Sequence, residues 1–534
     1  MVTYPTPQSV VYKKFKGLRT RNGVSSGGQI SAVVCQNIDF VPSEFEAGVI
    51  IRTAYGNVPI AEMADDYKGY KVIKGFEFDS ESDKHMLLYC ENDTKGVLLE
   101  LKDGVITPII DNTEIKVKEN KTVVCNFSVT GEANAIALLS LAYDTFVITN
   151  GKEYYAYCPD GNTKLQKIEP KYDGKSLTGL AMCEQEGSIV IGTNEGVVIG
   201  SRKGNITDFD YTISNDNNKA WYQLFGKPIT AVVPYIQSLI VFTGDDSTVL
   251  TGNMSEPSTA KRENASLGGC MSFESWVKHD KYLFFYDDTQ KNIYYYTQND
   301  FGQKILSEPI APEIQEFFDG VTKMQMISYI GENRSEIWLL SDKHKLIYDY
   351  FIGEWTERTG QTLTSYFTYD NAVYSTGGVK VLKEKAGEMG VFDGVFYPAI
   401  YTMQTINLGS FSNMKEMEFQ PLISVFENYD NNFYIDCLIN GKKTKTKYVQ
   451  MYLQGAIWAD DEPQTNLTSE NELWDVQTFG GENPTIVHQV KGKFISNWYY
   501  LQFTFRTAEQ GDNFSIVAFE LKGITQETDT VGVK

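Results

Sequence analysis

The chain has 534 residues, which is too long for a single hydrophobic core and indicates two or three domains. Aromatic residues make up 13% of it, and its 33 tyrosines and 30 phenylalanines favour β-strands and exclude a disordered chain. The formal net charge of −21 argues against a surface whose general purpose is to grip phosphate.

Residues 1–45 form the first predicted segment and differ in kind from the rest. Up to Asn22 this segment has no acidic residue but has five cations, which are Lys13, Lys14, Lys16, Arg19 and Arg21. One interpretation is an arm that docks on an acidic partner surface or on nucleic acid. The other is a solvated, flexible terminus.

Residues 46–390 form the second predicted segment, a β-propeller. It opens with residues 49–56, a predicted strand that we expect to pair with a distant blade and close the ring. Later in the segment, the stretch 253–270 is its longest polar interruption and is a candidate functional insertion.

The propeller prediction rests on a repeated hairpin, best seen in residues 335–360. Two runs of strand-forming residues, 337–340 and 346–350, flank a polar turn. A second turn at Gly353 then brings Trp355 back to cover the hairpin. We expect Trp338, Tyr348, Asp349, Gly353 and Trp355 to be structural residues of this blade.

The same hairpin recurs through the segment. Successive copies begin at Phe146, Ile189, Ile240, Leu283 and Trp338, which are separated by 43, 51, 43 and 55 residues. Weaker copies at 85–104 and 372–382 bring the total to about seven. Such spacing is typical of four-stranded propeller blades, and the alternative is a large irregular β-sandwich with accidental spacing.

Residues 391–534 form the third predicted segment, a β-sandwich-like domain. Its strands are longer and lack the blade spacing, and 454–485 is acidic and rich in loop residues. The segment ends with two long strand patterns, 492–506 and 514–521, around a turn at Gly511 and Asp512. We therefore expect an all-β chain, with a propeller followed by this domain.

Both ends of the chain resemble the hub and nozzle proteins of short-tailed bacteriophage tails, also called packaged-DNA stabilisation or tubular tail proteins. The opening has Gly17-Leu18-Arg19-Thr20-Arg21, a Gly/Ser stretch, and Gln36-Asn37-Ile38-Asp39-Phe40, with Arg19 where the family usually has Asn. The ending has a strand with Tyr500-Leu501-Gln502-Phe503, a Gly-Asp turn and the run 514–521. In that family the opening leads into a β-propeller.

The resemblance implies a structural virion protein of the tail, made in the host cytoplasm. It implies a homo-oligomeric ring, a hexamer, that contacts the portal or adaptor ring above and distal tail proteins below. Double-stranded DNA would pass transiently through an acidic channel whose wall repels phosphate, so that the genome is retained and then slides out at ejection.

The seven cysteines are scattered, and no two have C-x-x-C spacing, which argues against a zinc or redox site. Their simplest interpretation is synthesis in a reducing cytoplasm. The chain opens without a secretion signal, and no apolar run is long enough for a transmembrane helix.

No catalytic motif is present, so we expect no enzyme, no cofactor and no metal site. The four histidines are isolated, and there is no nucleophile elbow, P-loop or dinucleotide fingerprint. Asp208 and Asp210 together with 215–218 suggest calcium, but lack the glycine and final glutamate of an EF-hand loop. The turn from Asp349 to Trp355 resembles the structural Asp-box turns of sialidases.

Two functions from other classes stay open. A propeller that binds or depolymerises glycans at a phage or bacterial surface predicts aromatic and carboxylate side chains gathered in one pocket. A propeller scaffold for other cellular proteins predicts a stable monomer with one apolar face.

Overall fold

The structure is a computed structural model that describes most of the chain. The residues it does not describe are 1–7, 13, 20–28, 43–47, 64–66, 68, 80–83, 93–94, 109–126, 129–136, 142–144, 158–164, 214–215, 257, 266–267, 299–303, 332–333, 408–414, 417, 426–430, 452–485, 490–493, 496–497 and 527–534.

The chain divides into two compact units, but not at the boundaries expected from the sequence. Unit 1 combines Met1–Asn57, Leu346–Gly360 and Lys385–Lys534, and unit 2 combines Val58–Lys345 and Gln361–Glu384. The expected segments 1–45 and 391–534 therefore belong to one unit. Residues 346–360, expected inside the propeller, also cluster with unit 1. Hydrophobic patterning is local, and it carries no signal that the two chain ends share a core.

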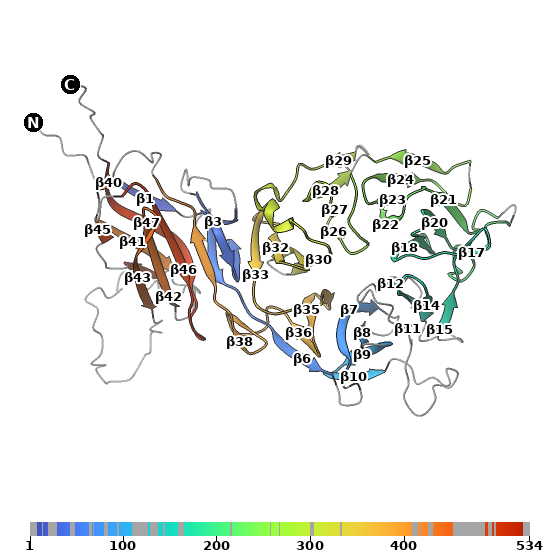
Figure 1. Ribbon diagram of the computed structural model, residues 1–534, viewed down its shortest axis with the longest axis horizontal. Helices are drawn as coiled ribbons and strands as arrows, with labels where there is room; N and C mark the ends of the chain where they lie inside the picture. Colours follow the sequence, from blue (N-terminus) through green and yellow to red (C-terminus); the bar gives the residue numbers. More distant parts are fainter. Residues whose placement is uncertain are drawn as a thin grey trace, which may run out of the picture. The chain divides into compact units, whose positions relative to one another are not determined.

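Unit 2 is a β-propeller with six complete blades, each an antiparallel sheet (Figure 1). Blade 1 consists of β7 (Lys71–Asp79), β8 (Lys84–Glu91), β9 (Lys95–Lys102), β10 (Val105–Pro108) and the short β11 (Phe127–Ser128). Blade 2 consists of β12 (Ala137–Leu141), β13 (Thr145–Thr149), β14 (Tyr154–Tyr157) and β15 (Leu165–Ile168). Blade 3 consists of β18 (Ala181–Gln185), β19 (Ser188–Gly192), β20 (Val197–Gly200) and β21 (Trp221–Leu224).

The remaining blades follow the same order of strands. Blade 4 consists of β22 (Ile229–Tyr235), β23 (Ser238–Thr243), β24 (Ser247–Thr251) and β25 (Lys261–Asn264). Blade 5 consists of β26 (Trp276–His279), β27 (Tyr282–Asp287), β28 (Asn292–Gln298) and β29 (Lys304–Leu306). Blade 6 consists of β34 (Ser365–Tyr369), β35 (Ala372–Gly377), β36 (Lys380–Lys383) and β6 (Val58–Glu62).

The connections add three short elements. These are the hairpin β16 (Lys171–Tyr172) and β17 (Lys175–Ser176) after blade 2, and the 3₁₀ segment η2 (Pro312–Phe318) after blade 5. The polar stretch 253–270, expected as an insertion, contains β25 and so supplies the outer strand of blade 4.

The blade count differs by one from the seven that the repeat predicted. The copy around Trp338 forms the hairpin β30 (Met324–Gly331) and β31 (Arg334–Ser341), which lies between blades 5 and 6 because β30 contacts both β26 and β34. Its next strands, β32 (Lys345–Asp349) and β33 (Glu354–Arg358), fall almost entirely in unit 1.

The first strand of each blade faces the centre of the ring, and hydrophobic cores fill the spaces between blades. β7 lies beside β34 and β12, and β18 lies beside β12 and β22. The core between blades 1 and 2 includes Leu87, Leu98 and Phe146, and the core between blades 4 and 5 includes Ile240 and Phe285. A lone blade cannot bury both faces, which is why the hairpin had to repeat.

The ring is closed by a strand from the N-terminal side of the propeller, but not by the expected one. β6 pairs antiparallel with β36 and completes blade 6. The expected closing strand, β5 (Val49–Thr53), instead pairs with β4 (Ile38–Pro42) and β47 (Ser515–Gln526) in unit 1. β5 is buried along its whole length, whereas only Ala61 of β6 is buried and its other residues are half-buried or exposed, as in an outer blade strand.

Unit 1 is built from strands of both chain ends. Besides β4, β5, β32, β33 and β47, its strands are β1 (Gln8–Tyr12), β2 (Lys14–Leu18), β3 (Gln29–Gln36), β37 (Val391–Phe392), β38 (Val395–Phe396), β39 (Ile400–Met403), β40 (Lys415–Glu416), β41 (Glu418–Val425), β42 (Asn431–Ile439), β43 (Lys442–Met451), β44 (Ile486–Gln489), β45 (Phe494–Ile495) and β46 (Leu501–Arg506).

The strands of unit 1 form a sandwich-like pair of sheets. One runs β43-β42-β46-β39-β3-β2, and the other joins β4, β5, β47 and β41. Their inward faces meet through phenylalanine rings: Phe503 and Phe505 of β46 lie 4.9 and 5.7 Å from Phe519 of β47, centroid to centroid. All three rings are fully buried, and each contributes roughly 2–3 kcal/mol through burial.

Within the described part of the chain, no helix is long and apolar enough to cross a membrane.

Candidate functional site

Gly17, the first residue of the resembling opening, lies in β2 and packs against the backbone of β33. A Cβ on Gly17 would come within 2.4 Å of the Trp355 carbonyl oxygen, so only glycine allows this approach. The Gly17 amide donates to Oε2 of Glu354 at 2.9 Å, and Arg19 lies 3.6 Å from the other oxygen. Burial raises the pKa of Glu354, and the Arg19 charge opposes this rise.

Asn37 connects the opening to the residue after β33. It is fully buried with a φ of 54°, a left-handed conformation that asparagine tolerates better than most residues. Its Nδ2 donates to Thr359 Oγ1 at 2.8 Å and to the Pro398 carbonyl at 2.9 Å. Its Oδ1 accepts from the Thr359 amide at 3.0 Å. These three hydrogen bonds hold Thr359 and Pro398 beside Asn37.

Asp39 forms a buried ion pair with Arg358 of β33. Nη2 of Arg358 bonds to Oδ1 of Asp39, and Nη1 donates to the Ile38 carbonyl at 2.9 Å. The side chains are only 2% and 5% exposed. Gly17, Asn37 and Asp39 therefore all attach residues 354–359 to the other strands of unit 1, which gives the opening a structural role.

The five cations of the expected docking arm do not form one cluster in the described residues. Lys14 is exposed on β2, Lys16 is half-buried, and Arg19 is engaged with Glu354. Lys13 and Arg21 lie outside the described residues. Because β1 to β4 are strands of unit 1, the described part of the segment is folded into that unit and is not a separate arm.

Trp338, the first expected blade residue, is a core residue of unit 2. It is 1% exposed, and its Nε1 donates to Oε2 of Glu336 at 2.9 Å. Its ring meets Tyr366 of β34 edge-on at 5.2 Å. It thus packs the hairpin β30–β31 against blade 6, and its indole N–H is satisfied despite the burial.

The other four expected blade residues form a tight turn in unit 1. The Asp349 carbonyl accepts from the Gly353 amide at 2.7 Å, and its Oδ1 accepts from the Ile352 amide at 2.9 Å. Gly353 has a φ of 75°, which favours glycine. The Tyr348 and Trp355 rings lie 4.7 Å apart, so Trp355 covers the hairpin as expected.

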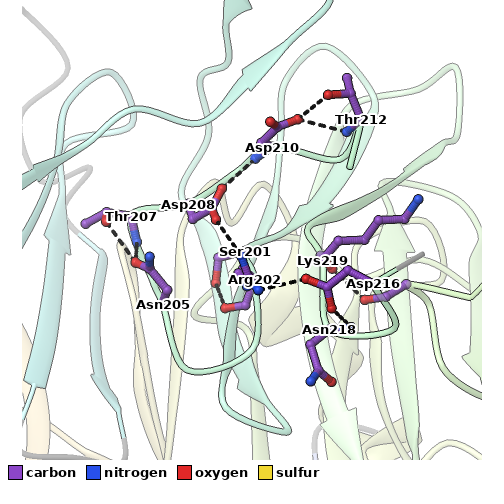
Figure 2. Close-up of polar contacts among 11 residues, drawn as sticks. Ser201, Arg202, Asn205, Thr207, Asp208, Asp210, Thr212, Asp216, Asn218 and Lys219 are labelled. Carbon is purple, nitrogen blue, oxygen red and sulfur yellow. Dashed lines mark hydrogen bonds and ion pairs between the residues drawn. The ribbon is translucent and has the colours of Figure 1, made fainter. Parts of the chain in front are cut away.

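The most elaborate described polar loop is 201–219, which joins β20 to β21 in blade 3 (Figure 2). Its Asp and Asn side chains bond to backbone two residues further on, as Asx turns do. Asp208 Oδ1 accepts from the Asp210 amide at 2.9 Å, and Asp216 Oδ1 accepts from the Asn218 amide at 2.8 Å. These turns let a long loop keep a defined path without secondary structure.

Arg202 lies between two of the loop's carboxylates, as Figure 2 shows. Its Nη2 is 2.8 Å from Asp216 Oδ2, and its Nη1 is 3.7 Å from Asp208 Oδ2. Oδ1 of Asp210 accepts from the Thr212 hydroxyl at 2.6 Å, which lowers the pKa of that carboxyl. A guanidinium between two carboxylates offsets part of their negative charge.

These contacts bear directly on the calcium interpretation. Within the described part of the chain, no group of three His, Cys, Asp or Glu side chains could hold a metal ion. Asn215, part of the suggested cluster, lies outside the described residues. The loop is instead held to blade 4, because Asn253 Nδ2 donates to the Asn217 carbonyl at 3.0 Å and Ser255 Oγ donates to the Lys219 carbonyl at 2.6 Å.

Three tyrosines lie together beside this loop. Tyr222 is 4.6 Å from Tyr172 and 4.8 Å from Tyr211, centroid to centroid. Tyr211 belongs to the loop, and its hydroxyl accepts from the Asp173 amide at 3.2 Å. Tyr172 and Tyr222 pack on the core between blades 2 and 3, so the cluster attaches the β16–β17 hairpin to the propeller.

An ion pair that the sequence did not indicate crosses the centre of the propeller. Nζ of Lys74, on β7 of blade 1, pairs with Oε1 of Glu274, which precedes β26 of blade 5. Lys74 also lies 5.1 Å from the Phe273 ring centre. Blade 6 and the β30–β31 hairpin separate these blades on one side and three blades separate them on the other, so the pair spans the axis.

A second set of contacts that the sequence did not indicate is buried in unit 2. His279 is 1% exposed, its Nδ1 lies 2.8 Å from Ser328 Oγ, and its Nε2 lies 2.6 Å from Ser335 Oγ. Burial lowers the pKa of His279. The group joins β26 to the hairpin β30–β31. Ser328 and Ser335 lie 49 and 56 residues from His279 in the sequence. This contact could be predicted only if the strand pairing and the order of the blades were already known.

No family model matches the chain, and no curated protein matches it. Among solved structures, it is similar to BBS1N in complex with ARL6DN, at 12% identity and a TM-score of 0.35, over 63% of this chain and 98% of that one.

Two further structures show a likeness of the same order. One is the extracellular domain of a putative one-component system from B. thetaiotaomicron, with 11% identity, a TM-score of 0.40, and coverage of 76% of this chain and 49% of that one. The other is YCF48 bound to D1 peptide, with 13% identity, a TM-score of 0.35, and coverage of 60% and 97%.

Proposed function

We propose that the chain is a structural protein of a short-tailed phage tail, a subunit of the nozzle or hub ring through which the genome is retained and then passes. The observation that carries the proposal is the shared location of the two resembling chain ends. β4 of the opening pairs with β5, and β5 pairs with β47 of the ending. β3 is joined to β46 through β39. Two segments more than four hundred residues apart thus build one unit.

The roles of the opening residues add support. Gly17, Asn37 and Asp39 each make a specific contact with residues 354–359. A motif that makes these contacts requires a particular architecture. In it, a β-unit made from both chain ends also contains a segment that lies, in the sequence, between strands of the propeller. The residues that carry the resemblance therefore have structural roles in this chain, which supports a protein of the same structural class.

The charge of the chain suits a conduit for DNA. A net charge of −21 repels phosphate, so that DNA slides along such a surface without adsorbing. The propeller's own axis is crossed by Lys74 and Glu274. In the proposed assembly the path for DNA therefore lies between subunits of a ring, and each propeller is a wall element.

The proposal is tested by mass photometry of the full-length chain over a wide range of concentrations. We expect a discrete closed oligomer, a hexamer, that forms without other proteins or on addition of the portal ring. Removal of residues 1–22 is a poor test, because β1 pairs with β47 and β2 pairs with β3 in unit 1. The charge reversal Lys14→Glu on the exposed face of β2 is the matched variant for docking to the ring above.

A monomer that never assembles on a portal, or turnover of a polysaccharide by the purified chain, would overturn the proposal. Turnover would instead favour a glycan-directed propeller. A polysaccharide panel measured by reducing-end release is therefore run beside the mass measurements.

A further inference from the structure

The outer face of one sheet of unit 1 carries a row of aromatic and charged side chains. β43, β42 and β46 lie side by side in this sheet (Figure 1). The side chains of a strand alternate between its two faces, and Phe503 and Phe505 of β46 face the core. Arg506 therefore lies on the opposite face. The register pairs it with Tyr434 of β42, which is paired in turn with Tyr448 of β43, and we name these three residues the outer row.

Arg506 is fixed within the outer row by its neighbours. Its guanidinium carbon lies 4.7 Å from the centre of the Tyr434 ring, and its Nε donates to Oδ2 of Asp436 at 2.8 Å. Asp436 lies two residues after Tyr434 and so on the same face, where its Oδ1 also accepts from the Thr446 hydroxyl at 2.6 Å. The carboxylate offsets the charge of the guanidinium. Because a guanidinium has further N–H groups beyond Nε, the pair leaves donors on this face without an unbalanced positive charge.

Tyr448 is the exposed end of the outer row. It is 42% exposed, although its ring centre lies 4.8 Å from that of Tyr434. Its hydroxyl lies 3.5 Å from Oδ1 of Asp512, whose Oδ2 accepts from the amides of Ala508 and Glu509 at 2.9 and 3.2 Å. The ring is therefore held in place and yet exposed, which suits contact with a ligand.

The chemistry of the outer row suits a sugar. A sugar ring has a face of C–H groups, which packs on the negative face of an aromatic ring, and it has hydroxyl groups around its edge. Those hydroxyl groups both donate and accept, and the site offers Arg506 as a donor and Asp512 as an acceptor beside Tyr448. Neighbouring strands lie about 4.8 Å apart, so the row extends about 10 Å from β43 to β46 and exceeds one sugar ring. We therefore expect an oligosaccharide.

The charges around the outer row select a neutral sugar. Asp436 balances Arg506, whereas Asp512 and the exposed Glu509 add negative charge beside Tyr448. An acidic saccharide would be repelled by these carboxylates. A cationic ligand would compete with Arg506 for the aromatic ring that this guanidinium already covers.

We propose that the outer row binds a neutral oligosaccharide. A sugar ring packs on Tyr448, Arg506 donates to its hydroxyl groups, and Asp512 accepts from them. The site adds an attachment function to the proposed tail subunit. It does not rest on the proposed ring, because every contact that carries it lies within unit 1. The step is binding alone, so no turnover of the saccharide is expected.

Isothermal titration calorimetry of the full-length chain tests the proposal with four neutral probes: cellohexaose, maltohexaose, mannohexaose and xylohexaose. We expect at least one of them to bind. Tyr448→Ala should weaken that binding about tenfold or more, because it removes the ring on which the sugar packs. Tyr448→Phe keeps the ring and should keep most of the affinity.

Tyr499→Ala is the matched control. Tyr499 is 41% exposed, close to the exposure of Tyr448, and its amide donates to Oδ1 of Asn440. Asn440 lies six residues after Tyr434, so Tyr499 lies about 20 Å from the outer row along the strand. Tyr499→Ala should leave saccharide binding unchanged. Thermal unfolding should show that both alanine variants stay folded, because both side chains are largely exposed.

Three results would overturn the inference. The first is that none of the four hexasaccharides binds to the wild-type chain. The second is that Tyr448→Ala binds its hexasaccharide with wild-type affinity. The third is tighter binding of a heparin hexasaccharide or of choline than of every neutral probe, with loss of that binding in Tyr448→Ala. Assembly is a separate readout: Tyr448→Ala should leave it unchanged, and a chain that never forms a ring would leave the saccharide site in place.

Discussion

The buried ion pair of Asp39 and Arg358 gives the sharpest stability prediction. Replacing Arg358 with leucine leaves the Asp39 carboxylate buried without its guanidinium. Because the two side chains are 2% and 5% exposed, the relevant cost is that of an uncompensated buried charge, about 3–5 kcal/mol of the free energy of unfolding. A surface pair would cost about 0–1 kcal/mol. The double variant Asp39→Asn with Arg358→Leu should be destabilised less than Arg358→Leu, because no buried charge is left.

The extent to which buried cysteines react at increasing urea concentration measures this loss of stability in each unit separately. Burial raises the pKa of Cys35 to about 12, so this thiol should react with iodoacetamide only when unit 1 opens. The described cysteines are all buried, with Cys35 and Cys437 in unit 1 and Cys90, Cys183 and Cys270 in unit 2. We expect Arg358→Leu to lower the midpoint for the unit 1 cysteines. A loss below about 1 kcal/mol in the free energy of unfolding of Arg358→Leu would refute the reasoning. A double variant that is less stable than Arg358→Leu would also refute it.

Three further predictions concern other contacts. His279→Gln should reduce the pH dependence of stability. Burial lowers the pKa of His279, so the unfolded chain binds a proton more readily and wild-type stability falls as pH drops through about 6.5 and below. Urea titrations at pH 7 and pH 5 should show a smaller fall in the variant. Gly353→Ala should destabilise the turn at φ 75° by about 1 kcal/mol and Gly353→Asn by less, measured by thermal unfolding. Glu274→Gln should lower stability by about 1 kcal/mol and reduce its salt dependence, whereas an unchanged salt dependence would mean that the pair with Lys74 contributes nothing.

The repeated hairpins of the propeller could be predicted from the sequence because their signals are local. Every copy, from 85–104 to 372–382, corresponds to the second and third strands of a sheet in the structure. These two strands are the most buried of a blade and carry the strongest runs of apolar residues. The blade count was less accurate, since the copy at Trp338 shares its pattern with the others while its later strands cluster with unit 1.

The contacts that join distant segments could not be predicted. The expected closing strand, β5, has the stronger strand propensity, because β6 contains Pro59, Ala61 and Glu62, yet β6 closes the ring. Propensity therefore does not tell which strand completes blade 6. Gly17, Asn37 and Asp39 were noticed through a resemblance, but their attachment to residues 354–359 follows only from the fold. The pair of Lys74 and Glu274 lies 200 residues apart, and no spacing rule links them.

Single-particle electron microscopy of the purified chain, alone and with a portal ring, tests the central claim most directly. The account predicts closed rings of subunits with an open central channel between them, and a propeller in each subunit whose own axis is crossed by the pair of Lys74 and Glu274. Particles that remain single subunits under both conditions, or rings in which density for DNA runs through the centre of a propeller, would contradict it.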